Sequence, residues 1–157
     1  MTVTPDGLRI EMLETASGAF FDLGSRSPNR RGAELLNLLA QQLGKLPNTI
    51  SVEGHTDSNP FSGNPEYGNW ELSADRANAA RRLMQESGLG EKQVTQIRGY
   101  ADQLLRNPND PSDPSNRRIS VIVQYPTRPD NQTAQPTPSV SNETKSSPPS
   151  LESPTKD

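Results

Sequence analysis

The chain has 157 residues, a length typical of one domain, and a formal net charge of −3. This small charge excludes the strongly basic surface that nucleic-acid-binding proteins carry, so we expect no nucleic-acid partner. The absence of cysteine excludes disulfides and thiolate metal sites, and a single histidine excludes a histidine-rich site. Composition leaves a carboxylate metal site open, but we expect no metal and no cofactor.

The apolar sequence is distributed unevenly and predicts two segments. Residues 1–125 contain every aromatic residue and nearly all of the periodic apolar sequence, whereas residues 126–157 are rich in Pro, Ser and Thr. The second segment cannot recover its ordering entropy by burial, so we predict a folded domain over 1–125 and a disordered tail over 126–157. No stretch approaches the ~20 apolar residues of a membrane helix. Met1 leads directly into the domain without a secretion signal, so we expect either a cytoplasmic protein or a fragment whose export segment has been removed.

In the first half of the domain, Gly7–Leu13 alternates apolar and charged residues, the period of a half-buried strand. Residues 18–28 have the composition of a loop, with Phe20 and Phe21 as its apolar anchor. Residues 29–46 are predicted to be a helix. Its core-facing stripe comprises five leucines at spacings of three and four: Leu35, Leu36, Leu39, Leu43 and Leu46.

The second half alternates strand and helix again. We predict strands at 49–53, 93–97 and 119–125, a helix at 69–87 that Asn69 caps, and polar loops at 58–68 and 101–116. Helices between strands imply crossover connections and helices packed against a sheet. The predicted fold is therefore a small α/β sandwich of the order β-α-β-α-β-β.

One arginine lies on the apolar stripe of the second helix. Arg76 shares that stripe with Leu72, and a guanidinium there needs either a carboxylate or a path to solvent. Asp57 ends the strand before this helix, which places it near the helix start. An acid and a guanidinium that do not fully neutralise each other form a receptor for a zwitterion, such as a free amino-acid end. The alternative is a structural salt bridge that orients the helix.

His55 stands two residues before Asp57 and raises the alternative of a hydrolase. Such catalysis needs a nucleophile, a base and an orienting group within hydrogen-bond reach, and no Gly-x-Ser-x-Gly elbow occurs. The position of His55 near a strand end favours a buried, hydrogen-bonding histidine instead.

Three motifs in order resemble the OmpA-like peptidoglycan-binding domain: Gly54–Asp57 (Gly-His-Thr-Asp), Leu72–Ala77 (Leu-Ser-Ala-Asp-Arg-Ala) and Asn116–Ile119 (Asn-Arg-Arg-Ile). The longer segment Asn69–Arg82 resembles the MotB family of flagellar stator proteins within that class. The resemblance covers residues 3–125. It implies an OmpA-like two-layer sandwich, with the helices packed on a mixed four-stranded sheet.

The resemblance also implies roles for particular residues. It implies that Asp57 and Arg76 bind the amino and carboxylate groups of diaminopimelate in the peptide stem of peptidoglycan, without catalysis. Four further residues match family positions in or beside the binding groove: Thr56, Leu72, Arg81 and Arg117.

The family further implies a homodimer that anchors the stator complex to the wall, association with MotA, and contact with the P-ring of the flagellar basal body. The expected location is the periplasmic domain of a single-pass inner-membrane protein whose membrane helix is not in this sequence. One alternative is a generic peptidoglycan anchor of an outer-membrane protein or lipoprotein. Another, from a different class, is a cell-wall amidase or similar hydrolase.

Overall fold

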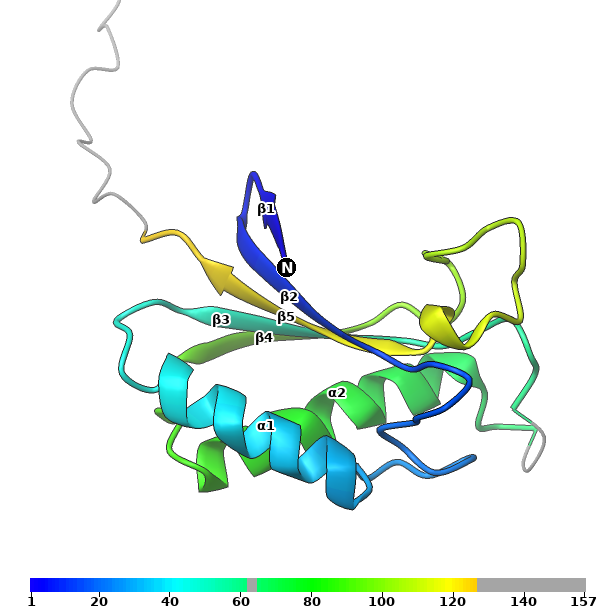
Figure 1. The fold of residues 1–157 in the computed structure, drawn as a ribbon, viewed down its shortest axis with the longest axis horizontal. Helices are drawn as coiled ribbons and strands as arrows, with labels where there is room; N and C mark the ends of the chain where they lie inside the picture. Colours follow the sequence, from blue (N-terminus) through cyan, green and yellow to red (C-terminus); the bar gives the residue numbers. More distant parts are fainter. Residues whose placement is uncertain (62–64, 127–157) are drawn as a thin grey trace, which may run out of the picture. The chain divides into compact units, whose positions relative to one another are not determined.

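The structure is a computed structural model that describes residues 1–61 and 65–126 (Figure 1). The predicted tail, apart from Pro126, lies outside the described residues. The elements in chain order are β1 (Thr2–Thr4), β2 (Gly7–Leu13), α1 (Arg30–Leu43), β3 (Ile50–His55), α2 (Asn69–Glu86), β4 (Val94–Gly99), the short 3₁₀ helix η1 (Pro114–Asn116) and β5 (Arg118–Gln124). The predicted order from β2 to β5 is confirmed. Over the described residues, no helix has the length and apolar character needed to span a membrane.

The sheet has five strands in the order β1-β2-β5-β3-β4. Only the β3–β4 pair is parallel, so the sheet is mixed, as the resemblance implied. The expectation of four strands is corrected by β1, which pairs with the start of β2 at the sheet edge. Strand β1 has three residues and is largely exposed, so it carries no apolar alternation that would reveal it.

Both helices cover one face of the sheet (Figure 1), and the core lies between these two layers. Ile50, Val52 and Val121 point from the central strands toward Leu36 of α1 and Met84 of α2. The predicted leucine stripe of α1 is confirmed at Leu36 and Leu43, which are buried, while Leu39 packs partly buried against the core. It is wrong at Leu35, which is 39% exposed, and at Leu46, which is 43% exposed because the helix ends before it.

Two glycines let α2 approach the sheet closely. Gly54 of β3 and Gly99 of β4 are neighbours in register, directly beneath the helix. A Cβ on Gly54 would lie 1.9 Å from the Ser73 main-chain oxygen, and one on Gly99 would lie 2.7 Å from the Ala74 nitrogen. The helix backbone therefore rests on a part of the sheet without side chains. This contact fixes the start of α2 beside the end of β3.

The sheet face opposite the helices carries a buried ionic cluster. Glu53, which is 2% exposed, accepts a hydrogen bond from Arg9 Nη1 at 2.7 Å and one from Arg98 Nη1 at 3.3 Å. Burial opposes ionisation of Glu53, but its contacts with His55 and Arg9 outweigh burial and lower the pKa to about 2. His55 stacks on Tyr100 with ring centroids 5.1 Å apart. His55 is 2% exposed, which confirms that it is buried, but neither ring nitrogen has a hydrogen-bond partner among the described residues, and Nε2 lies 3.7 Å from Glu53 Oε2.

We expect the domain to lose stability as the pH falls below about 6.5, the ordinary pKa of histidine. Burial lowers the pKa of His55, and the nearby charges of Arg118 and Arg9 act the same way, although Glu53 opposes them. Protonation therefore favours the unfolded state, so this stability is present above pH 6.5 and decreases on acidification. The slope can reach ~1.4 kcal/mol per pH unit for one proton. Urea unfolding between pH 7 and 5 measures it.

The variant His55→Gln removes the titrating group, so its stability should change less over the same pH range. Equal slopes for the variant and the wild type would contradict this prediction. Glu53 affects stability over a lower range of pH, because its pKa is about 2 in the folded protein, compared with an ordinary value of 4.5. Its contribution is present above pH 4.5 and is lost toward pH 2.

Candidate functional site

A pocket of about 400 Å³ opens at the end of the domain where β3 leads into α2. The loops before α1, after β3 and before β5 gather at this end (Figure 1). Five of the six residues expected at the site line it: Thr56, Asp57, Leu72, Arg76 and Arg117. The other lining residues are Leu23, Gly24, Asn59, Pro60, Phe61 and Asn69.

Asp57 supplies the acid of the pocket and is 6% exposed. Its Oδ2 accepts a hydrogen bond from Arg117 Nη1, and its Oδ1 accepts one from the Asn59 main-chain N–H at 3.1 Å. Asn69 Nδ2 donates to the Asp57 carbonyl at 3.3 Å and so holds the main chain at the same point. The carboxylate is thus fixed in place by two different segments.

Arg76 supplies the guanidinium and is 5% exposed. Its Nε donates to the Ser25 carbonyl at 2.9 Å and its Nη2 to the Asp22 carbonyl at 3.4 Å, and the group lies 4.8 Å over the Phe21 ring. Burial lowers the pKa of Arg76, while the negative charges of Glu14 and Asp57 act in the opposite direction. The side chain is therefore held by main-chain oxygens and an aromatic face.

No ion pair joins Asp57 to Arg76 in the described part of the chain, although both line the same pocket. The structure therefore does not contain the alternative arrangement, a salt bridge between Asp57 and Arg76, because Asp57 pairs with Arg117 instead. The pocket consequently presents a carboxylate and a guanidinium that are near each other but not joined. This arrangement suits a ligand that carries an ammonium and a carboxylate on one carbon.

Glu14, at the end of β2, is a residue of the site that the sequence analysis missed. Arg117 Nε donates to Glu14 Oε2 at 2.6 Å, so Arg117 bridges Glu14 and Asp57. Burial opposes the charge of Arg117, but the two carboxylates outweigh it and raise the pKa of Arg117. Nothing in the sequence pattern pairs positions so far apart.

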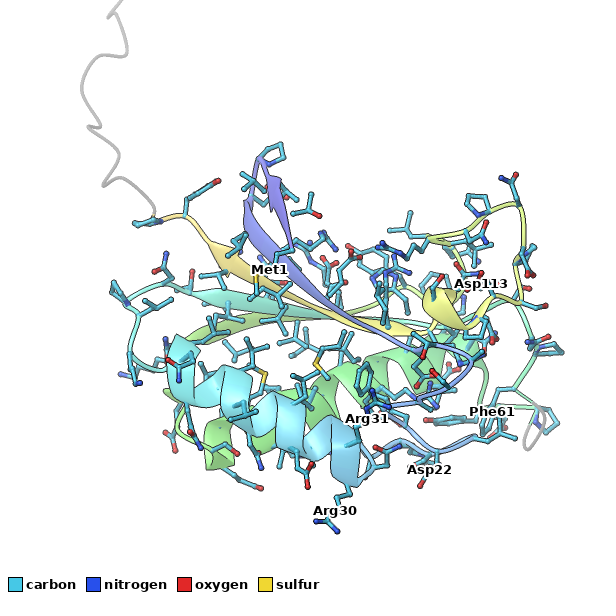
Figure 2. All side chains as sticks on the ribbon, viewed as in Figure 1. Met1, Asp22, Arg30, Arg31, Phe61 and Asp113 are labelled. Carbon is cyan, nitrogen blue, oxygen red and sulfur yellow. The ribbon has the colours of Figure 1, made fainter. Side chains whose placement is uncertain are left out.

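Two apolar residues, the exposed Leu23 and the half-buried Phe61, line the pocket and were also missed. Leu23 is 104% exposed, and Phe61 lies against Gly24, whose φ of +69° turns the loop toward it. Phe61 also meets Tyr67 edge-on, with centroids 5.2 Å apart. In Figure 2 the labelled Phe61 and Asp22 lie at the same end of the domain. Leu23 and Phe61 give the aliphatic part of a ligand an apolar surface.

Two predictions about α2 differ from the structure. Arg81 does not line the pocket, because its Nε and Nη1 donate to Asn78 at 2.9 Å and Gln85 at 2.6 Å on its own helix. It lies five positions after Arg76, which places the two about 140° apart around the helix. Gly68, not Asn69, caps the helix, and its N–H donates to Glu71 at 2.8 Å. Asn69 instead holds the loop through the carbonyls of Asp57 and Asn59.

Several known proteins are similar to this chain in sequence, in fold or in both. Motility protein B of Escherichia coli (strain K12) is 40% identical over 119 residues, which are 75% of this chain and 39% of that protein. The periplasmic domain of Helicobacter pylori MotB has a TM-score of 0.66 at 22% identity and covers 77% of this chain and 78% of that chain. The peptidoglycan-associated lipoprotein from Burkholderia pseudomallei has a TM-score of 0.53 at 30% identity and covers 67% and 87%.

The fold and the pocket together define a small α/β binding domain rather than an enzyme. The OmpA family matches residues 20–137, and the chain belongs to that family. Its relatives make it an OmpA-like domain of the MotB type. The chain spans about two fifths of the length of E. coli motility protein B.

Proposed function

We propose that this domain anchors a flagellar motor stator to the cell wall by holding the diaminopimelate of peptidoglycan peptide stems. One observation carries the proposal: Asp57 and Arg76 line one pocket with no ion pair between them. The free end of diaminopimelate carries an amino group and a carboxylate on one carbon. Asp57 would accept the ammonium, and Arg76 would donate to the carboxylate with N–H groups that the Ser25 and Asp22 carbonyls leave free.

The pocket supports this ligand in size and in surface. A volume of about 400 Å³ accommodates a ligand of amino-acid size. The aliphatic chain between the two ends of diaminopimelate would lie against Leu23, Phe61 and Leu72. Arg117 and Thr56 would border the ammonium, since both line the pocket beside Asp57.

The assembly belongs to the same proposal. Kinship with motility protein B supports a periplasmic domain of a single-pass inner-membrane protein, which acts with MotA as a stator and contacts the flagellar P-ring. A homodimer would hold the wall more strongly, because binding of one domain raises the effective concentration of the second domain near the peptidoglycan, without a new contact. A generic anchor of an outer-membrane protein or lipoprotein is the second candidate. The likeness to the Burkholderia lipoprotein favours it.

The pocket assignment is tested by co-sedimentation of the chain with purified peptidoglycan sacculi. We expect the wild type to pellet, and Asp57→Asn or Arg76→Ala to weaken binding roughly ten- to a hundredfold, since a lost charged hydrogen bond costs ~1.5–3 kcal/mol. Arg82→Ala is the matched control, because Arg82 is an exposed arginine of the same helix.

Unchanged pelleting of both folded site variants would refute the assignment of the pocket. Release of soluble muropeptides from the sacculi by the wild type would support the hydrolase alternative instead. Circular dichroism melting curves of each variant separate loss of binding from loss of folding.

A further inference from the structure

We propose that Glu14 sets the charge of the pocket: by sharing the Arg117 guanidinium with Asp57, it leaves Asp57 with negative charge that an ammonium ligand can bind. The inference rests on the proposed function, because it concerns the ammonium half of the same ligand. Glu14 is in this proposal a positioning residue that acts through Arg117.

The geometry shows one cation between two carboxylates. Arg117 Nε donates to Glu14 Oε2 at 2.6 Å, while Arg117 Nη1 donates to Asp57 Oδ2. Glu14 is 3% exposed and Asp57 is 6% exposed, so solvent screens the two carboxylates weakly, whereas the Arg117 side chain is 28% exposed. The formal charge of these three side chains is −1. A pair of Arg117 and Asp57 alone would be neutral and would attract an ammonium much less.

Glu14 acts from behind the pocket. It is absent from the residues that line the pocket, whereas Asp57 and Arg117 are among them. Its Oε1 accepts hydrogen bonds from the main-chain N–H groups of Phe20 at 3.3 Å and Phe21 at 3.2 Å. These bonds keep the carboxylate beside Arg117. Arg76, the group for the ligand carboxylate, is held separately by the carbonyls of Ser25 and Asp22.

The test uses the full chain and two probes: a soluble peptide stem that ends in diaminopimelate and has a blocked N-terminus, and the same peptide after N-acetylation of the free amine of its diaminopimelate. Affinities are measured by titration calorimetry. We expect the wild type to prefer the free amine by roughly tenfold or more. In Glu14→Gln the affinity for the free amine should fall about tenfold, while that for the acetylated peptide stays the same. The preference is then lost.

Two variants serve as controls. Glu14→Asp keeps the charge and should keep most of the preference. Glu11→Gln removes a carboxylate from the same strand, where Arg106 and Arg118 engage it, and should leave the preference unchanged. A general effect of net charge would change Glu11→Gln as much as Glu14→Gln.

The outcomes separate this inference from the proposed function. A wild type that binds neither peptide overturns both. The inference alone is overturned if folded Glu14→Gln keeps the preference for the free amine. It is also overturned if Glu14→Gln loses affinity for both peptides to the same extent. If Glu14→Gln does not fold, Arg117→Gln provides a second test. Removing the shared cation leaves at least one negative charge on the two carboxylates, even if one of them takes up a proton, so the preference should be kept, and its loss would overturn the inference.

Discussion

Replacing Gly54 by alanine is expected to lower the free energy of unfolding by about 3 kcal/mol, at the upper end of what overpacking of a core costs. The new Cβ would lie 1.9 Å from the Ser73 main-chain oxygen, and a main-chain atom in the middle of a contact cannot rotate away. Helix α2 must therefore shift from the sheet. That shift would also move Arg76 relative to Asp57, so binding to sacculi should weaken as well. Urea unfolding and co-sedimentation measure the two effects.

Gly18→Ala is the matched control for this substitution. A Cβ there would meet the guanidinium end of Arg31 at 2.1 Å, and the far end of a flexible arginine can swing aside. We expect a change within about 0.5 kcal/mol, as for most surface substitutions. Equal losses of stability in Gly54→Ala and Gly18→Ala would show that the close approach of α2 to β3 does not limit the fold.

A chimera of E. coli motility protein B, in which this domain replaces the matching region, is expected to restore swimming to cells that lack motility protein B. The 40% identity over the matched region makes the exchange conservative. The same chimera with Arg76→Ala should reach the membrane and the motor but fail to support swimming, because its grip on the wall is lost. Swarm diameter and the fluorescence of labelled stators at the motor measure the two steps.

The chimera with Arg82→Ala is the control, since it removes an exposed arginine of the same helix. Full swimming by the Arg76→Ala chimera would refute anchoring through this pocket. Failure of the unmutated chimera, at normal abundance, would favour the generic peptidoglycan anchor over the stator.

The order of the elements was predictable because each long element has a clear period. The alternation in Gly7–Leu13 places Leu8, Ile10 and Met12 against the core. The spacing of Leu36 and Leu43 likewise corresponds to the buried face of α1. Asp57 and Arg76 were predictable for a related reason, since a strand end and the following helix start must be close. The charge pattern around one strand end and one helix start therefore pointed to the acid and the guanidinium of the pocket, Asp57 and Arg76.

The rest of the site depends on contacts that no local pattern records. The pair of Arg117 and Asp57 joins positions 60 residues apart, and the pair of Arg117 and Glu14 joins positions 103 apart. Leu23 and Phe61 lie in loops, whose conformation has no period. The motif match also pointed to Arg81, but it does not include the angle of a residue around its helix, and the structure does not place Arg81 in the lining of the pocket.

The topology of the sheet determines how the domain would resist a pulling force. Strand β2 pairs antiparallel with β5, and β5 pairs antiparallel with β3, so β2 and β3 run in the same direction. Gly7, at the start of β2, therefore lies at the opposite end of the sheet from the pocket beyond His55. A pull between the segment before β2 and a ligand in the pocket would slide these strands along their length. All hydrogen bonds of both ladders then resist together, in shear, whereas a pull across the strands would open them one at a time.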